Sequence, residues 1–222
     1  MTAPLEQVAF DIETTGFDVD DEVTVVGFAV PMGVRVFVQT GGRSAVDVED
    51  VVEEATETLV KVSTHQSERA LLKAVAGFVE ERLCDEDVLL VAYNGERWNG
   101  GFDLPFLRTR YAQLDVPWPF VDVAYADVLP LVSDRFNTTV DGDEHGDLAA
   151  AYEVLCDGAY GDLDPFADSK EAVAAFDDGR FGELVLHNVA DVLRTRALGR
   201  VAEQYCSKSE FSVKSLTPTR SI

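Results

Sequence analysis

The stretch QVAFDIE, Gln7–Glu13, followed by Thr14-Thr15-Gly16, decides the fold of this 222-residue chain. Apolar side chains occupy every second position of the stretch, which is the period of a half-buried β-strand: Val8, Phe10 and Ile12. The Thr-Thr-Gly turn ends the strand. Asp11 and Glu13, two residues apart, project from the same face, about 6.6 Å apart along the chain. The stretch therefore predicts a strand with one apolar face and one face that carries two carboxylates.

Two further strands are expected directly after this one. Val23–Val30 and Val34–Thr40 are rich in β-branched residues, and Pro31-Met32-Gly33 between them suits a hairpin turn. Three consecutive strands with short links predict an antiparallel meander.

The rest of the chain alternates helical and extended patterns, with the second half mainly helical. We expect strands at Leu59–Ser63 and Val88–Tyr93, a Gly/Asn-rich loop at Asn94–Gly101 and a polar loop at Asp134–Gly146. We expect helices at Val48–Leu59, Ser67–Leu83, Leu104–Leu114, Ala124–Val132, Asp147–Leu155, from Lys170, and at Gly182–Tyr205. The prediction is an α/β fold, with a mixed sheet flanked by helices.

The chain reads as one domain with a short tail. Residues 1–205 show no internal repeat and no break in composition, whereas residues 206–222 hold seven Ser or Thr and carry a net charge of +2 against −25 for the rest. A solvated, disordered terminus is the expectation for that tail.

The composition excludes several classes of protein. Hydrophobic residues make up 46% of the chain, enough for a core, so intrinsic disorder is not expected. No run of 18 apolar residues and no basic-plus-apolar leader is present, which predicts a cytoplasmic protein without a membrane segment. Three widely spaced cysteines form neither a disulfide framework nor a CxxC pair.

The charge is strongly acidic and spread over the whole chain. There are 41 Asp and Glu against 18 Lys and Arg, only five of them Lys, and the formal net charge is −23. This pattern resembles the proteins of salt-accumulating halophiles. Such a charge normally opposes nucleic-acid binding, but in molar salt the Debye length falls to about 3 Å. The charge therefore does not exclude a phosphate substrate.

Two later segments carry acids that could join Asp11 and Glu13. In GFDLPFL, Gly101–Leu107, Asp103 precedes a helix with an early proline, so a helix cap is the structural alternative. His187 and Asp191 are four apart in the longest helical pattern and share a face. Since their flanks are apolar and an unpaired buried Asp is costly, that face needs a metal or a partner if it points inward.

Together, the three segments resemble the DEDD 3′–5′ exonucleases of the ribonuclease-H-like superfamily. The closest resemblance is to the predicted YprB-type ribonuclease-H-like exonucleases and to the proofreading domains of family-B polymerases, over roughly residues 5–205. The resemblance places Asp11 and Glu13 in the first motif, Asp103 in the second and Asp191 in the third. It implies a ribonuclease-H-like fold.

The activity implied by the resemblance is hydrolysis of phosphodiester bonds with two Mg²⁺ or Mn²⁺ ions. Asp11, Glu13, Asp103 and Asp191 would be the ligands, with Asp11 as the bridge, and hard cations prefer such oxygen ligands. His187 would orient or deprotonate the attacking water. The substrate would be the 3′ end of single-stranded DNA or RNA, and a proofreading role would require a separate polymerase or repair partner.

Residues around these acids are candidates for substrate contacts. Thr14 and Thr15 would receive the terminal nucleotide through backbone groups, and Phe102 would wedge near its base. Relatives often have two residues between the Gly and the Phe of this motif, whereas six separate Gly95 from Phe102 here. Within that insertion, Arg97 could contact a phosphate and Trp98 could stack on a base. Alternatively, the insertion is a tolerated surface loop.

The last motif departs from both branches of the family. One branch has Tyr-x-x-x-Asp and the other His-x-x-x-x-Asp, whereas this chain has His187-x-x-x-Asp191. Two alternatives therefore stay open. The chain could be a catalytically weak or inactive nucleic-acid-binding module of the same fold, or a ribonuclease-H-type endonuclease.

Overall fold

The computed structural model describes residues 5–46, 48–84, 87–96, 102–156, 158–168 and 170–220. These residues form a seven-stranded sheet in the order β4-β3-β2-β1-β5-β6-β9 and a two-stranded sheet of β7 and β8. The strands are β1 (Glu6–Thr14), β2 (Val23–Val30), β3 (Gly33–Gln39), β4 (Val60–His65), β5 (Val88–Ala92), β6 (Ala124–Asp127), β7 (Thr139–Val140), β8 (Asp143–Glu144) and β9 (Lys214–Ser215).

The predicted three-strand meander is confirmed. β1 pairs antiparallel with β2, and β2 pairs antiparallel with β3. The strands outside the meander add parallel pairs, β3 with β4, β1 with β5 and β5 with β6, and the edge strand β9 is antiparallel to β6. The fold is therefore α/β with a mixed sheet, as the sequence predicts.

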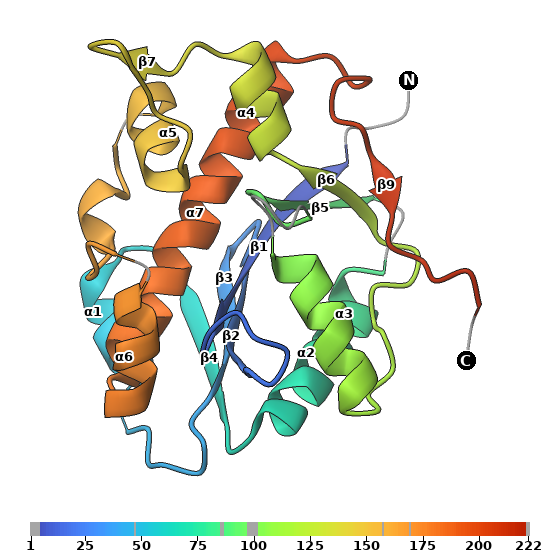
Figure 1. Ribbon diagram of the computed structural model, residues 1–222, viewed down its shortest axis with the longest axis vertical. Coiled ribbons are helices and arrows are strands. Elements are labelled where there is room, and N and C mark those ends of the chain that lie inside the picture. Colours follow the sequence, from blue (N-terminus) through green and yellow to red (C-terminus); the bar gives the residue numbers. More distant parts are fainter. Residues whose placement is uncertain are drawn as a thin grey trace.

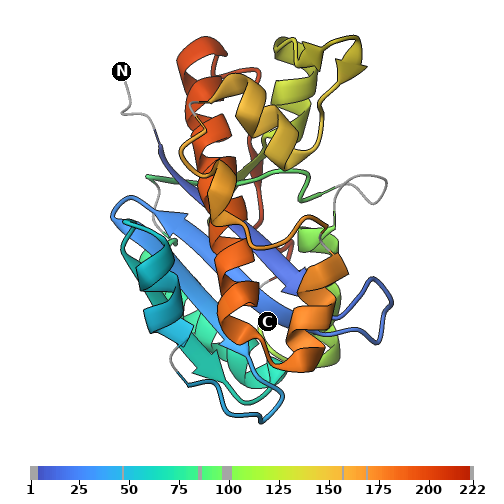
Figure 2. The same ribbon diagram turned by 90° about the vertical axis from the view of Figure 1, so that its left-hand side faces the viewer.

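Helices cover both faces of the large sheet (Figures 1 and 2). The 25-residue α7 crosses one face, with α1, α5 and α6 packed against it, and α2 and α3 cover the other face. The helices are α1 (Val48–Ala55), α2 (Glu68–Arg82), α3 (Asp103–Gln113), α4 (Leu129–Arg135), α5 (Leu148–Leu155), α6 (Lys170–Asp178) and α7 (Phe181–Tyr205), with a 3₁₀ turn at Gly161–Leu163.

The alternation of β1 separates two cores. Val8, Phe10 and Ile12 pack with α2 and α3 in a core that includes Leu71 and Leu104. On the opposite face, Ala9 joins the core under α7. Because side chains alternate along a strand, Asp11 and Glu13 lie on the α7 face, beyond Ala9.

The predicted helix at Ala124–Val132 is wrong in its first half. Ala124–Asp127 is the strand β6, which pairs in parallel with β5, and a helix begins only at Leu129. Pro130 lies in the first turn of that helix, a position where its missing N–H removes no hydrogen bond. That proline marked the true helix start. The helix α1 also ends at Ala55, four residues before the predicted end at Leu59.

The C-terminal segment is packed, contrary to the expectation of a solvated, disordered terminus. β9 adds the last strand to the sheet beside β6. Phe211 and Leu216 are buried, and the indole of Trp118 donates to the carbonyl of Leu216 (3.1 Å). Two apolar residues among many Ser and Thr are enough to fix the segment, because a neighbouring strand supplies its hydrogen-bond partners.

The predicted polar loop at Asp134–Gly146 contains the small β7–β8 hairpin. Asp141 and Gly142 both have positive φ at its turn (52° and 97°), as a type I′ turn requires. Within the part of the chain that the structure describes, no helix has the length and apolar character needed to cross a bilayer.

Candidate active site

Asp11 and Glu13 on β1 lie under the first half of α7, where Asn188 and His187 approach them. Asp11 accepts a hydrogen bond from the side-chain amide of Asn188 on α7 (Nδ2 to Oδ2, 2.9 Å). Glu13, two residues further along the same face, has a side chain only 11% exposed. A helix thus covers both carboxylates and removes most of their hydration.

A glycine in the neighbouring strand allows this close packing. Gly27 on β2 pairs directly with Asp11, and a Cβ at this position would overlap the Oδ1 atom of Asn188. An isolated glycine inside a strand is the usual sign of such a close approach. The sequence analysis missed Gly27 and Asn188, although the glycine in the centre of an otherwise β-branched strand was a readable signal.

The helix α7 also presents His187 and Asp191 to the same place. The Nε2 atom of His187 lies 3.8 Å from Oε1 of Glu13 and 3.7 Å from Oδ2 of Asp191. One ligand atom from each of the three side chains lies within 4.8 Å of the others. His187 and Asp191 therefore face inward, toward Glu13 on β1, and not toward solvent.

Two residues that the sequence analysis missed hold this histidine and Asp191. Asp164, just after the 3₁₀ turn, bonds Nδ1 of His187 at 2.8 Å. Arg194 bridges Asp164 (2.9 Å) and Asp191 (3.0 Å) through its Nη1 atom. Arg194 follows Asp191 by three residues on a buried helix, which was a usable signal. Asp164 lies in irregular chain, and no sequence pattern marks it.

Asp103 belongs to α3, which covers the face of the sheet opposite α7, and it approaches the other acids from that side. It is the first residue of α3, Phe102 occupies the N-cap position, and no side-chain capping bond is formed. The capping interpretation of Asp103 is therefore wrong. Asp103 is 9% exposed, and a Cβ on Gly95 would lie 3.4 Å from its Oδ2 atom.

Burial raises the pKa values of the four carboxylates, and neighbouring charges make smaller contributions. Burial raises the pKa of Asp11 well above its ordinary value, and the charges of Glu13, Asp103 and Asp191 raise it further. Burial raises the pKa of Glu13 to about 7, although His187 partly opposes this. Ligand atoms of Glu13, His187 and Asp191 thus lie within 4.8 Å of one another, whereas Asp11 and Asp103 join this group through their electrostatic interactions with Glu13 and Asp191.

Burial is also the main cause of the raised pKa values of the other two acids, Asp103 and Asp191. Burial, followed by the charges of Glu13, Asp127 and Asp191, raises the pKa of Asp103 well above its usual range. Burial also raises the pKa of Asp191, against the lowering by His187 and Arg194. With Asp164 included, two cations, His187 and Arg194, thus face five carboxyl groups, and the cluster lacks counter-charge.

His187 is held charged by its carboxylate neighbours. Burial lowers its pKa, but the bond to Asp164 and the charges of Glu13 and Asp191 outweigh burial and raise the pKa to about 9. Burial raises the pKa of Asp164, but the bond and charge of His187, the N–H of Phe166 and the bond from Arg194 together outweigh burial and lower this pKa. The Asp164 bond also fixes Nε2 as the ring atom that faces Glu13 and Asp191.

This donor set fits divalent cations. It is composed of carboxylate oxygens, which Mg²⁺ and Mn²⁺ prefer, and burial without a counter-ion is unfavourable for every member. The buried Oδ1 atom of Asn188 has no hydrogen-bond partner among the described residues. A cation bound at the cluster would supply the missing counter-charge, whereas the Oδ1 atom of Asn188 packs against Gly27.

The residues predicted to contact substrate differ in how many of their polar groups already form hydrogen bonds within the protein. The Thr14 hydroxyl donates to the carbonyl of Gly16 (2.7 Å), and the Thr15 hydroxyl donates to Asp21 (2.9 Å). The backbone N–H of Thr15 already donates to the carbonyl of Glu22 (2.9 Å). Both hydroxyls and the Thr15 N–H thus serve the turn after β1, while a substrate role for the two residues stays a prediction.

Phe102 forms part of an aromatic group near Asp103. Its ring packs edge-on against Phe17 (5.0 Å between centroids) and also contacts Phe106 (4.7 Å). Phe17 is 70% exposed. The other predicted contacts, Arg97 and Trp98, lie outside the described residues.

Comparison with known proteins gives no family assignment: no family model and no curated protein sequence matches this chain. The site must therefore be judged on its own residues.

Proposed function

We propose that this chain is a metal-dependent 3′–5′ exonuclease of the DEDD type that acts on single-stranded DNA or RNA. The observation that carries the proposal is the convergence of Asp11, Glu13, Asp103 and Asp191 from three distant segments. Four buried carboxylates with raised pKa values are unstable together, and a protein retains such a cluster where it binds cations.

The topology supports a ribonuclease-H-like fold. The antiparallel meander β3-β2-β1 continues into the parallel strands β5 and β6, and a late helix crosses the sheet above β1. This is the arrangement that the resemblance in sequence implies: a first strand with two acids, a second acid after a buried strand, and a third on a late helix.

In this proposal Asp11, Glu13, Asp103 and Asp191 would be the residues that hold Mg²⁺ or Mn²⁺. Ions bound there would lower the pKa of a water molecule and offset the charge that builds on the phosphate during hydrolysis. The residues' own task is positional. Asn188 fixes the Asp11 carboxylate, and Arg194 fixes Asp191.

His187 handles the proton. Because Asp164 occupies Nδ1, the Nε2 atom lies between Glu13 and Asp191 and is placed to orient a water molecule. It could accept that water's proton only with bound cations nearby, because their charge would lower the raised pKa of His187 and leave Nε2 unprotonated. His187 at this spacing can thus serve the role expected of the aromatic or histidine residue in the last motif.

One observation favours the alternative of a non-catalytic nucleic-acid-binding module. Arg194 already neutralises one oxygen of Asp191, which reduces the negative charge offered to a metal. Titration calorimetry with Mn²⁺ separates the two proposals, since an inactive module should show no two-ion binding.

The direct test is incubation with end-labelled single-stranded DNA and RNA, with Mn²⁺, in molar KCl. We expect mononucleotides released stepwise from the 3′ end. Internal fragments of RNA–DNA hybrids would favour the ribonuclease-H-type endonuclease instead. No cleavage of any of these substrates, with Mn²⁺ bound, would contradict the proposal.

A further inference from the structure

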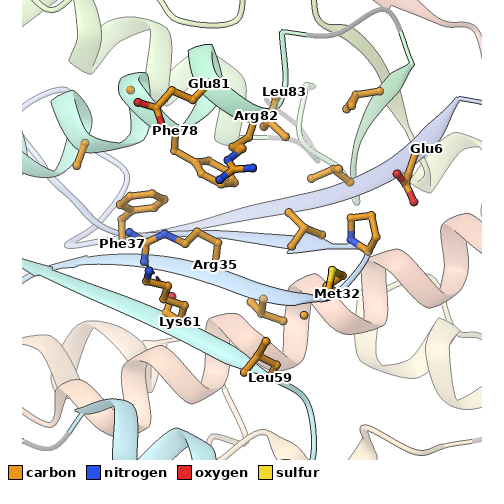
Figure 3. Close-up of a pocket in the computed structure, with 18 residues that line it drawn as sticks. Glu6, Met32, Arg35, Phe37, Leu59, Lys61, Phe78, Glu81, Arg82 and Leu83 are labelled. Atoms are coloured by element: carbon orange, nitrogen blue, oxygen red, sulfur yellow. Dashed lines mark hydrogen bonds between the residues drawn. The ribbon is translucent and has the colours of Figure 1, made fainter.

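A long groove lies on the face of the sheet opposite the acidic cluster (Figure 3). It has a volume of about 840 Å³ and runs between α2 and the strands β2, β3 and β4. It reaches the first residues of β1 and β5, Glu6 and Val88, whereas the carboxylates lie toward the other ends of these strands. The groove is therefore separate from the candidate active site.

The groove has an apolar lining. Val8, Val34 and Phe37 from the sheet and Phe78 from α2 contribute to it. At its rim, Met32 is 84% exposed and Leu59 is 65% exposed. Large apolar side chains left this open beside an apolar hollow are typical of a surface that binds another molecule.

A glycine in the middle of α2 gives an independent indication. Gly77 lines the groove, and a Cβ at this position would have no protein atom within 4 Å. A glycine inside a helix costs about 0.5–1 kcal/mol relative to alanine. Nothing in the packing of the described residues requires glycine here. Its absence of a side chain leaves room for another chain to approach the helix backbone.

Acids outnumber cations in the chain as a whole, whereas cations outnumber acids among the residues that line the groove. Arg35, Lys61 and Arg82 line it together with two acids, Glu6 and Glu81, whereas acids exceed cations 41 to 18 in the whole chain. No described carboxylate lies within ion-pairing distance of any of these three cations.

The three cations converge from both walls. Figure 3 shows Arg82 reaching from α2 toward the sheet, where Arg35 and Lys61 lie. Arg35 is held in place: it lies over the ring of Phe37 (4.1 Å) and donates to the carbonyl of Lys61 (3.0 Å). Three cations without a direct ion pair, against two acids in the same lining, leave the groove with an excess of positive charge that is complementary to a negatively charged occupant.

The edge of the sheet next to the groove is open to strand addition. β4 is the last strand on that side, and β3 is its only strand partner among the described residues. Lys61, which lines the groove, lies within β4. An extended segment beside β4 could therefore pair with its backbone and place alternate side chains into the groove.

We propose that this groove binds an extended segment of a partner protein, composed of alternating apolar and acidic residues. The rings of Phe37 and Phe78 already pack against each other (5.6 Å between centroids), so the apolar side chains of the segment lie over Phe78 and beside the exposed Met32 and Leu59. Its backbone passes over Gly77, and its carboxylates meet Arg35, Lys61 and Arg82. This binding does not depend on the proposed nuclease activity, because the groove and the carboxylates lie on opposite faces of the sheet.

The test uses the full chain and a short fluorescein-labelled peptide that alternates Ile or Phe with Asp or Glu, measured by fluorescence anisotropy in molar KCl. A second peptide has Lys in place of its acids, and a third has Ser in place of its apolar residues. We expect binding of the first peptide with a Kd on the order of micromolar, and at least tenfold weaker binding of the other two.

Two variants locate the binding. The double variant Lys61→Glu, Arg82→Glu and the single variant Gly77→Trp, which fills the groove, should each weaken binding at least tenfold. Lys73→Glu changes an exposed cation on the same helix outside the groove and should leave binding within about twofold. The melting temperature of each variant checks that it folds, and Gly77→Ala, which adds a single methyl group, serves as a milder probe.

Three results would overturn the proposal. Binding of the acidic peptide that none of the groove variants weakens would place it elsewhere. Equal binding of the Lys-containing peptide would remove the role of the cations. A single-stranded oligonucleotide that binds and loses its affinity in the same variants would assign the groove to nucleic acid instead.

Discussion

Buried charges are fully paired on one face of the sheet and incompletely paired on the other. On the α2 face, Glu68 and Arg110 form a two-bond ion pair (2.7 and 2.6 Å), and Glu68 also accepts from the backbone N–H of Val23 (2.9 Å). On the α7 face, four acids share His187 and Arg194 as their only described cations. The first arrangement is electrically complete, and the second is not.

The difference separates a structural role from a chemical one. A complete pair needs nothing further and stabilises the contact between α2 and α3. An incomplete cluster destabilises the cation-free fold, and any cation that binds the native state selectively stabilises it by mass action. The predictions below are ordered from the largest expected change in free energy to the smallest.

Neutralising one acid of the cluster should remove activity while preserving the fold. For Asp11→Asn and Asp191→Asn we expect nucleotide release to fall by at least about 10⁴-fold, equivalent to roughly 5 kcal/mol. In the presence of a chelator Asp11→Asn should melt at or above the wild-type temperature, because one repulsive charge is gone, whereas Asp191→Asn also removes the ion pair with Arg194 and should not gain stability in this way. Single-turnover assays and calorimetry measure the two effects, and undiminished release in either variant would contradict the assignment of the ligands.

Breaking the Glu68–Arg110 ion pair should lower stability and leave activity unchanged. Glu68→Gln leaves Arg110 buried without its charge partner, which typically costs about 3–5 kcal/mol of stability. We expect a lower denaturant midpoint with nucleotide release unchanged at temperatures where the variant is folded. A loss of activity larger than the loss of folded protein would show that the two faces are not independent.

Removing the proton-handling group should have an intermediate effect. His187→Ala is expected to slow hydrolysis about 10²-fold or more, the usual range for a positioned acid–base group. Asp164→Asn, which disturbs the position of the same ring, should slow it roughly tenfold. If His187→Ala changes the rate less than about twofold, His187 is structural.

The chelated protein should lose stability as the pH rises. Glu13 has its pKa raised to about 7 and His187 to about 9, and the pKa values of Asp11 and Asp103 are also raised. A raised pKa in the folded state gives stability that is complete below the unfolded value and is lost as pH rises through the folded value. All four groups therefore act in the same direction between pH 5 and 8.

The expected decrease in melting temperature over that interval is on the order of 5 °C. It should be measured in molar KCl, which screens the surface acids. Asp11→Asn should reduce the slope, and saturating Mn²⁺ should nearly remove it. A chelated protein that becomes more stable from pH 5 to 8 would contradict the raised pKa values.

Much of the fold could be read from local pattern. The strands β1, β2 and β3 and the helices α2, α3 and α7 follow from apolar spacing alone. β6 was misjudged because four residues are too short to distinguish a strand from a helix turn by period. The C-terminal segment was misjudged because its order comes from pairing with β6, a contact between segments distant in sequence.

The candidate site was read only in part for a similar reason. Acids with a strong local context, Asp11 and Glu13 after an apolar strand, stand out in sequence. Asp164 and Asn188 do not, because their importance comes from the side chains that they contact across the fold. Positioning residues are visible only once the elements are packed.

The most direct test of the account is titration calorimetry of the purified chain with Mn²⁺ in molar KCl. We expect two ions to bind per chain, with both Asp11→Asn and Asp103→Asn weakening that binding. Asp143→Asn, which changes an exposed acid on β8, is the matched control and should bind as the wild type does. Absence of binding by the wild type, or equal binding by all variants, would show that the four carboxylates do not form a metal site.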